Sequence, residues 1–188
     1  MKIAITGHTA GIGQALANIL LARGHEIIGI SRRTGENIRR IKHTANLIEP
    51  CELFINNAQT LYAQTELFYE VWQKWRGIPK KYIWNISTQM TEQPINGAIE
   101  GMDDIVMSAY RNQKIALEEA SRQLRFKNSW PHVTIIRPGS IATYDKFNMK
   151  NRADVKQWAK SIIDIFSHNE NISISEISVG YTTKRIAI

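Results

Sequence analysis

The chain has 188 residues, of which 43% are hydrophobic and 22% charged, and its formal net charge at pH 7 is +7. This size and balance are typical of one globular domain with enough residues to bury a core. The single cysteine, Cys51, excludes an intrachain disulfide and a cysteine-rich metal site, and the five histidines show no metal-ligand spacing. No apolar run approaches the roughly 18 residues that a membrane span needs, and no signal peptide is visible. We therefore expect a cytoplasmic protein that has no metal and no membrane partner.

The excess of positive charge raises the question of nucleic-acid binding. The basic residues are scattered rather than gathered into one stripe. Attraction to an anionic cofactor, or solubility alone, explains them more simply. We predict no nucleic-acid partner. Examples of the scattered basic residues are Arg32, Arg33, Arg39, Arg40, Lys80 and Lys81.

Apolar periodicity predicts strands that alternate with helices along the whole chain. A strand at residues 2–6, a helix from Gly11 to Gly24 and a strand at 25–31 form a first βαβ unit. Such alternation predicts a parallel sheet with helices on both faces. The helix at 66–76 carries an aromatic stripe (Phe68, Trp72, Trp75) that we assign to the core or a subunit interface, not to a ligand site. The further predicted strands are 51–56, 82–86, 133–137 and 172–179, and the further helices are 103–126 and 155–168.

Three glycines, Gly7, Gly11 and Gly13, lie where the first strand gives way to the first helix. A dinucleotide loop needs glycines there because one turns the chain, one lets the backbone approach the pyrophosphate and one lets the helix pack closely. The helix N-terminus then offers free N–H groups and partial positive charge to the phosphates. This position predicts a dinucleotide cofactor.

The end of the second strand bears on which dinucleotide is bound. An acidic residue about 20 positions after the glycines commonly binds the adenosine ribose hydroxyls. Here the strand ends in Ser31-Arg32-Arg33, and Arg32 lies 19 residues after Gly13. A guanidinium suits the 2′-phosphate of NADP, so NADP(H) is favoured over NAD(H). A solvated arginine pair at the start of a loop is the alternative.

Five ordered motifs resemble those of the short-chain dehydrogenase/reductase family. They are T-G-H-T-A-G-I-G at 6–13, N-N-A at 56–58, Ser87 after a strand, Y-R-N-Q-K at 110–114 and P-G-S-I-A-T at 138–143. The resemblance implies a three-layer, Rossmann-type, doubly wound α/β fold over a single domain, residues 1–188. It also implies an oxidoreductase that interconverts a carbonyl and an alcohol.

The resemblance carries the family's catalytic roles onto three residues. Ser87 would hold and polarise the substrate carbonyl, and Tyr110 would exchange a proton with the substrate oxygen. Lys114, one helical turn after Tyr110, would bond the nicotinamide ribose and lower the pKa of Tyr110. That help is needed because free tyrosine titrates near ~10.

The same resemblance assigns cofactor contacts to both ends of the nucleotide. Asn57 and Ala58 would line the adenosine side, Ile141 would meet the carboxamide and Thr143 the phosphates. The full predicted set of cofactor residues is Gly7, His8, Thr9, Gly11, Ile12, Gly13, Arg32, Asn37, Asn57, Ala58, Tyr110, Lys114, Pro138, Gly139, Ile141 and Thr143.

The chain departs from the family pattern in several places. Only 25 residues separate Arg32 from Asn57, about half the usual stretch. We therefore expect the second helix to be missing and the third strand to be reduced to around 37–38, with Asn37 contacting adenine. Gln59 stands where the family has Gly. The catalytic Asn of many members is absent, so water, backbone or another polar group, of which Gln64 is nearest, takes its place, or turnover is weak.

Ser87 and Tyr110 are 23 residues apart, wider than in the family. The extra loop at 88–102 either covers the substrate pocket or is a tolerated surface insertion. We expect this loop and residues 144–156 to set specificity.

Two other functions remain open at the level of the sequence. A regulator that binds NADP(H) without catalysis would explain the missing Asn, although binding alone does not require Tyr110. A sugar epimerase or dehydratase would need a larger C-terminal substrate domain than the 45 residues after Thr143. We predict a small carbonyl or alcohol substrate and a homodimer or homotetramer formed through the helices at 66–76 and 103–126.

Overall fold

The computed structural model describes residues 1–92, 103–143, 152–167 and 173–180. Six strands form one parallel sheet in the order β2-β1-β3-β4-β5-β8. The strands are β1 (Lys2–Thr6), β2 (Glu26–Ile30), β3 (Leu53–Asn56), β4 (Tyr82–Ile86), β5 (His132–Pro138) and β8 (Glu176–Val179). Two short strands, β6 (Ile141–Ala142) and β7 (Ala153–Asp154), pair with each other beyond the carboxyl end of β5.

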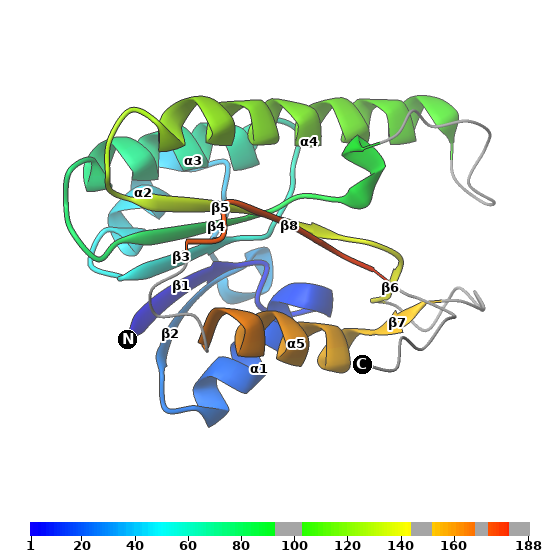
Figure 1. Cartoon of the computed structure of the whole chain (residues 1–188), viewed down its shortest axis with the longest axis horizontal. Helices are drawn as coiled ribbons and strands as arrows, with labels where there is room; N and C mark the ends of the chain where they lie inside the picture. The colour runs from blue at the N-terminus through cyan, green and yellow to red at the C-terminus, as the bar shows by residue number, and fades with distance from the viewer. Residues whose placement is uncertain (93–102, 144–151, 168–172, 181–188) are drawn as a thin grey trace.

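The helices form a layer on each face of the sheet (Figure 1). One layer holds α1 (Gly11–Ala22) and α5 (Val155–Ser167), and the other holds α2 (Ile41–Ile48), α3 (Ala63–Trp75) and α4 (Asp104–Arg125). The predicted three-layer doubly wound fold is therefore confirmed. Among the described residues, no helix combines the length and apolar character needed to cross a bilayer.

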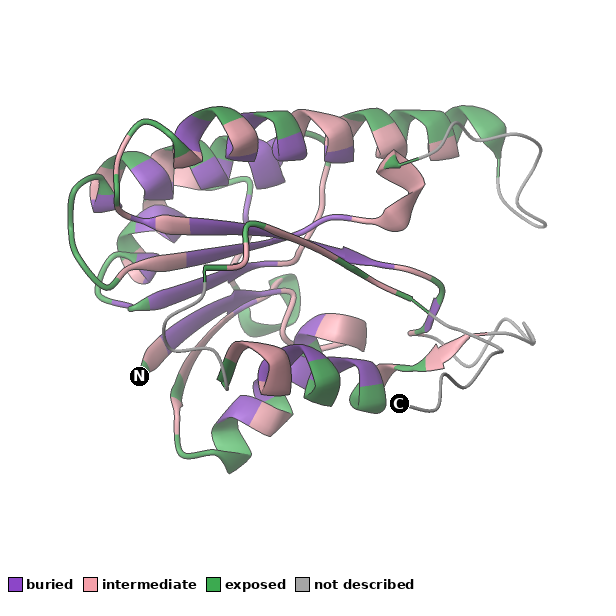
Figure 2. Cartoon of the chain, in the orientation of Figure 1, coloured by how far each residue is buried: buried purple, intermediate pink, exposed green. Residues whose placement is uncertain are grey.

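Alternation along the strands divides the core between the two layers (Figure 2). On β3, Phe54 packs with α2, α3 and α4, whereas its neighbours Leu53 and Ile55 pack with α1 and α5. Successive side chains point to opposite faces of a strand, which is why a four-residue apolar run serves both cores. The aromatic stripe of α3 is buried in the first core, so its assignment to the core is confirmed.

The shortened stretch between β2 and β3 differs in detail from the expectation. Every residue there is described, and none of them is a strand. Residues 31–40, where the second helix was expected to be missing, contain only a short 3-10 turn, η1 (Arg32–Thr34), and α2 begins after them. The expected strand remnant at 37–38 is wrong. Buried Ala45 and Ile48 and partly buried Ile41 give α2 an apolar face. That helical spacing is visible in the sequence and was overlooked.

The order of the strands determines where a ligand fits. From β1 the chain moves outward to β2 and then returns to the other side of β1 to form β3. In open parallel sheets, ligands bind at the carboxyl ends of the strands where the direction of winding reverses. That place lies between β1 and β3, directly beside the glycine loop.

Candidate active site

The glycine loop has the conformation that the sequence predicts. Gly7 has a φ of +72°, which favours glycine. A Cβ at Gly13 would stand 2.4 Å from the carbonyl oxygen of Gly7, so only glycine lets the start of α1 approach the end of β1. The N-terminus of α1 is thereby brought against the loop, where its free N–H groups are available to an anion.

Thr6 joins this loop to the N-N-A stretch. Its hydroxyl oxygen accepts hydrogen bonds from the backbone N–H groups of Asn57 and Ala58, both at 2.9 Å. The amide of Asn57 donates to the Thr6 carbonyl oxygen at 2.9 Å. Two motifs that are 50 residues apart in sequence therefore form one wall of the site.

A cavity of about 380 Å³ opens at this wall. Nine of the predicted cofactor residues line it, namely Gly7, Thr9, Gly11, Ile12, Arg32, Asn37, Asn57, Ala58 and Thr143. His8 and Gly13 are not in the lining, nor are the Tyr110 and Lys114 pair or Pro138, Gly139 and Ile141. The sequence analysis missed Ala10, Ile30, Ser31, Arg33, Glu36, Ile38, Gln59 and Thr60.

The His8 side chain is turned toward the sheet. A Cβ at Gly29 would lie 2.4 Å from its Nε2, so the ring rests on the backbone of β2. Its Nδ1 is buried, with no hydrogen-bond partner among the described residues. The imidazole therefore lies beside the glycine loop and does not line the cavity.

The end of the cavity formed by the segment after β2 carries charges of both signs. Arg32 and Arg33 are exposed there, and the Arg33 side chain donates to the Thr9 carbonyl at 3.4 Å. Glu36, which follows η1, also lines the cavity, and its carboxylate lies 2.9 Å from His43 Nε2 on α2. The short segment between β2 and α2 therefore contributes the Glu36 carboxylate to the cavity. The usual spacing of about 20 residues from the glycines does not predict it.

The P-G-S-I-A-T segment returns from β5 to the glycine loop. Thr143 lines the cavity, and its Cβ would be 3.4 Å from a Cβ at Gly11. Gly139 packs where a Cβ would meet Gln89 Oε1 at 2.4 Å. Gly139 thus allows the segment to pass close to the turn after β4.

Tyr110 and Lys114 lie together on α4. The Nζ of Lys114 is 5.6 Å from the centroid of the Tyr110 ring. Lys114 is buried, and its Nζ donates to Gln64 Oε1 at 2.8 Å and to the Ile86 carbonyl at 2.7 Å. Burial lowers the pKa of Lys114 to about 7, and the Glu118 carboxylate one turn later opposes that shift.

Gln64, at the start of α3, is oriented by its own hydrogen bonds. Its amide nitrogen donates to the carbonyls of Asn56, at 2.7 Å, and Ile86, at 3.1 Å. Both N–H groups are then used, so Oε1 is left to accept from Lys114. The absent catalytic Asn was expected to be replaced by water, by backbone or by a polar group such as Gln64. The structure places Gln64 beside Lys114.

Ser87 and Thr88 share the turn after β4 but face different partners. Ser87 is buried, and its hydroxyl donates to Glu118 Oε1 at 2.5 Å. It is the Thr88 side chain, by hydrogen bonding, that lowers the pKa of Tyr110, and Thr88 Oγ1 also accepts from the Met90 N–H at 3.3 Å. The structure therefore brings Tyr110 together with Lys114 and Thr88, whereas Ser87 bonds to a different group on α4.

The alternation of β4 contains the signal for this difference. Asn85 points toward α4, where its amide donates to Ser121 Oγ at 2.8 Å. Ser87, two residues on, lies on the same face of the strand and is covered by the same helix. Its neighbour Thr88 is only partly buried, and its Oγ1 accepts from the backbone of its own turn. The catalytic role expected for Ser87 stays a prediction.

Burial raises the pKa of Tyr110 above its ordinary value, and the Thr88 hydrogen bond opposes the shift. The lowered pKa that the sequence predicts for Tyr110 beside Lys114 is therefore not found in the chain alone. Burial disfavours the phenolate because the charged form loses hydration.

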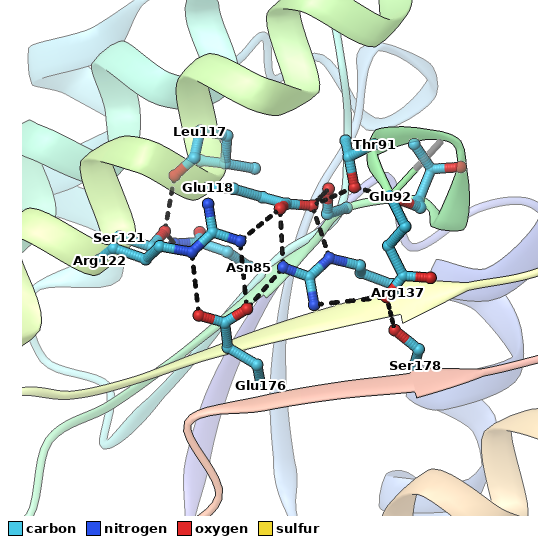
Figure 3. Close-up of polar contacts among 12 residues, drawn as sticks. Asn85, Thr91, Glu92, Leu117, Glu118, Ser121, Arg122, Arg137, Glu176 and Ser178 are labelled. Atoms are coloured by element: carbon cyan, nitrogen blue, oxygen red, sulfur yellow. Dashed lines mark hydrogen bonds and ion pairs between the residues drawn. The ribbon is translucent and has the colours of Figure 1, made fainter. Parts of the chain in front are cut away.

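Behind the turn lies a cluster of buried charges (Figure 3). Arg137 of β5 donates to Glu118 through Nε at 2.9 Å and Nη2 at 2.7 Å, and Nη2 also donates to Glu176 of β8 at 2.6 Å. Burial alone would raise the pKa of Glu118, but hydrogen bonds from Arg137, Ser87 and Thr91 outweigh it and hold the pKa below its ordinary value. Glu118 is thus a carboxylate.

A larger cavity, of about 650 Å³, lies at the opposite end of the sheet. Its walls are largely aromatic and aliphatic and include Tyr82, Trp84, Trp130 and Phe166. None of the residues predicted for the site lines it, so the chemistry is placed at the smaller, more polar cavity.

Comparisons with known proteins agree with this geometry. Residues 3–68 match the model of the NAD dependent epimerase/dehydratase family. This match includes the glycine loop and the N-N-A stretch but ends before Thr88. A probable NADP-dependent dehydrogenase of Dichelobacter nodosus is 33% identical over 73 residues, which are 39% of this chain and 69% of that protein.

Solved structures show the same fold over nearly the whole chain. A short-chain dehydrogenase from Streptomyces avermitilis superposes with a TM-score of 0.75 at 18% identity, covering 95% of this chain and 88% of that one. An alcohol dehydrogenase from Thermococcus sibiricus, complexed with 5-hydroxy-NADP, gives 0.70 at 12% identity, covering 100% and 99%. Serine dehydrogenase from Escherichia coli gives 0.69 at 15% identity, covering 99% and 100%. With its motifs, its fold and its curated relative in agreement, the chain belongs to the short-chain dehydrogenase/reductase family.

Proposed function

We propose that this protein is an NADP(H)-dependent oxidoreductase that interconverts a carbonyl and an alcohol by hydride transfer. The observation that carries the proposal is the group formed by Tyr110, Lys114 and Thr88. A tyrosine hydroxyl is hydrogen-bonded to a second hydroxyl, and a buried lysine lies beneath its ring. A structural role offers no reason to bury an ammonium there, because burial carries a large cost in free energy.

The residues present fit a dinucleotide. The glycine loop leaves room for a backbone approach, α1 directs its N-terminus at the loop, and the cavity adjoins both. Gln59 links the cavity to the catalytic helix, since its amide donates to Gln113, the residue before Lys114. The nicotinamide would accordingly lie toward Tyr110, with Thr143 beside the phosphates.

The bound cofactor would supply or accept the hydride. In the direction of reduction, Tyr110 donates its proton to the substrate oxygen as negative charge develops there. When substrate is bound, the Thr88 hydroxyl would turn its single proton from Tyr110 to the same oxygen. This is the role predicted for Ser87, whose hydroxyl is already used by Glu118. Lys114, whose Nζ lies 5.6 Å from the centroid of the tyrosine ring, would stabilise the phenolate that remains whenever it is protonated.

Two observations support NADP(H) as the preferred dinucleotide. Arg32 and Arg33 are exposed at the adenosine end, where guanidinium groups suit a ribose phosphate. The curated relative is itself described as NADP-dependent, and the Thermococcus enzyme was solved with a form of NADP. Glu36 would repel that phosphate, so the two guanidinium groups have to outweigh its carboxylate, which lies 2.9 Å from His43 Nε2.

The test is NADPH oxidation with a panel of aldehydes and ketones, using wild type and Tyr110→Phe. The substitution removes one hydroxyl, so folding and NADPH binding should be nearly unchanged. Turnover should fall by at least the ~10²–10⁴-fold that is typical of a lost general acid. Reductase activity that survives in Tyr110→Phe would show that the chemistry has been assigned to the wrong residue.

The regulator hypothesis predicts a different pattern. Wild type would then turn over no carbonyl in the panel, yet bind NADPH with an affinity indifferent to Tyr110. A Tyr69→Phe variant, which loses an exposed hydroxyl on α3, is the matched control for removal of a tyrosine hydroxyl.

A further inference from the structure

The turn that carries Thr88 is attached to α4 along its whole length. It consists of Ser87, Thr88 and the 3-10 turn η2 (Gln89–Thr91). The Arg111 guanidinium donates to the carbonyls of Met90, at 2.8 Å, and Thr91, at 3.3 Å. Tyr110 immediately precedes Arg111 on α4. The helix and the turn are therefore joined close to the hydroxyls of Tyr110 and Thr88.

One carboxylate binds both ends of this turn. Oε1 of Glu118 lies 2.5 Å from the Ser87 hydroxyl and 2.7 Å from the Thr91 hydroxyl. Thr88 lies between these two residues in sequence. The Thr91 hydroxyl is also 2.8 Å from the Thr88 carbonyl, and its single proton is shared between the two acceptors.

The arginines hold Glu118 in place independently of the turn. Arg137 binds both of its oxygens, and Arg122 donates to Oε2 at 3.0 Å (Figure 3). Arg122 and Arg137 are bound in turn by Glu176 on β8. Contacts from α4, β5 and β8 therefore anchor the Glu118 carboxylate without help from the turn. The carboxylate is a rigid acceptor for the hydroxyls of Ser87 and Thr91.

We propose that Glu118 is a positioning residue whose anchored carboxylate, through the hydroxyls of Ser87 and Thr91, holds the turn so that Thr88 meets Tyr110. This inference rests on the proposed function for the roles of Thr88 and Tyr110. It assigns a structural role to Ser87, for which the sequence predicts a catalytic role. It also explains why Glu118 follows Tyr110 and Lys114 at successive turns on one side of α4.

The test removes the two attachments and leaves the charges untouched. Ser87→Ala and Thr91→Val, alone and combined, keep Arg137 and Glu118 paired. The double variant should lose roughly 10–100-fold in kcat, as expected when a catalytic group is displaced by about 1 Å, with the affinity for NADPH unchanged. Thr91→Ser restores a hydroxyl and should recover most of the turnover.

Ser178→Ala is the matched control. Ser178 also donates to a carboxylate of this cluster, that of Glu92, but it belongs to β8 and not to the turn. Its loss should leave turnover at the wild-type level. If Ser87→Ala alone abolished turnover while Thr91→Val matched wild type, Ser87 would belong to the chemistry and the positioning role would be wrong.

A second readout does not depend on turnover. Tyrosine labelled with ¹³C at Cζ gives one titrating NMR signal per residue, and Tyr110→Phe identifies the signal of Tyr110. The Thr88 hydrogen bond lowers the pKa of Tyr110, so Thr88→Val and the double variant should both raise it, whereas Ser178→Ala should not. An unchanged Tyr110 titration in the double variant would overturn the proposal even if wild type reduced no carbonyl, an outcome that would by itself refute only the proposed function.

Discussion

Lys114 shows how a single residue at this site lowers the stability of the fold. Its side chain is buried against Gln64 and the Ile86 carbonyl, and its ammonium has lost the hydration that it has in the unfolded chain. Two neutral acceptors compensate only in part, so the pKa falls from 10.5 to about 7. A group that destabilises the apo fold in this way is typical of an active site.

This shift predicts a pH dependence of stability. Between about pH 7 and pH 10.5 the unfolded chain holds a proton on Lys114 that the folded chain has lost. Stability therefore rises with pH across this window, because the burial penalty disappears as the unfolded lysine also becomes neutral. Relative to Lys114→Met, wild type should gain about 2 kcal/mol in free energy of unfolding between pH 7 and pH 9.

Urea denaturation of both proteins at several pH values measures this difference. Titrations elsewhere in the chain are common to the two proteins and cancel. A gap between wild type and Lys114→Met that stayed constant from pH 7 to pH 9 would mean that Lys114 keeps its proton in the fold.

Arg32 leads to a prediction about the cofactor. It is an exposed guanidinium that lines the adenosine end of the nucleotide cavity. NADPH should bind more tightly than NADH by about 1–3 kcal/mol, the value of charge-assisted contacts to one additional phosphate. Titration of both nucleotides into wild type, Arg32→Ala and the control Arg39→Ala checks this. Equal affinities in wild type, or a preference that persists in Arg32→Ala, would contradict it.

At the level of elements, the sequence predicts those strands, helices and turns that depend on apolar periodicity or on the conformation of glycine. The sheet, the two helical layers and the glycine loop follow from alternation and from the positions of Gly7 and Gly13. The start of the last strand was placed at 172, whereas β8 begins at Glu176, and α3 begins three residues earlier than expected. Ends of elements depend on capping and tertiary contacts, which periodicity does not contain.

The parts of the site that were missed depend on contacts between distant segments. Nothing local in I-S-T-Q-M shows that Ser87 lies beneath α4 and Thr88 beside Tyr110; that follows from Glu118, 31 residues away. Glu36 reaches the cavity because the segment after β2 turns directly into α2. The specificity segments predicted at 88–102 and 144–156 lie largely outside the described residues, at 93–102 and 144–151.

The whole molecule is a sheet whose carboxyl edge gathers three functions from separate segments. β1 and α1 provide the glycine loop, β4 and α4 the hydroxyls and the lysine that we propose for the reaction, and β5 the segment that returns to the loop. The charge cluster of Glu118, Arg137 and Glu176 connects α4, β5 and β8 behind them (Figure 3). The short connection from β2 to β3 thus leaves intact the elements that meet at this edge, and β2 is the last strand on its side of the described sheet.

The helices α3 and α4 also present apolar side chains to solvent, which bears on assembly. Tyr69 of α3 is 45% exposed, and Ile105 and Val106 at the start of α4 are 80% and 63% exposed. We predict an isologous dimer through the layer of α3 and α4, or a tetramer that contains it, because a two-fold axis would bury these exposed apolar side chains on both subunits. Light scattering at micromolar concentration should give at least twice the 21.5 kDa of one chain. Ile105→Glu with Val106→Glu should shift the mass to that of a monomer, whereas Leu21→Glu, an exposed position on α1 in the other layer, should not; a monomeric wild type would refute the prediction.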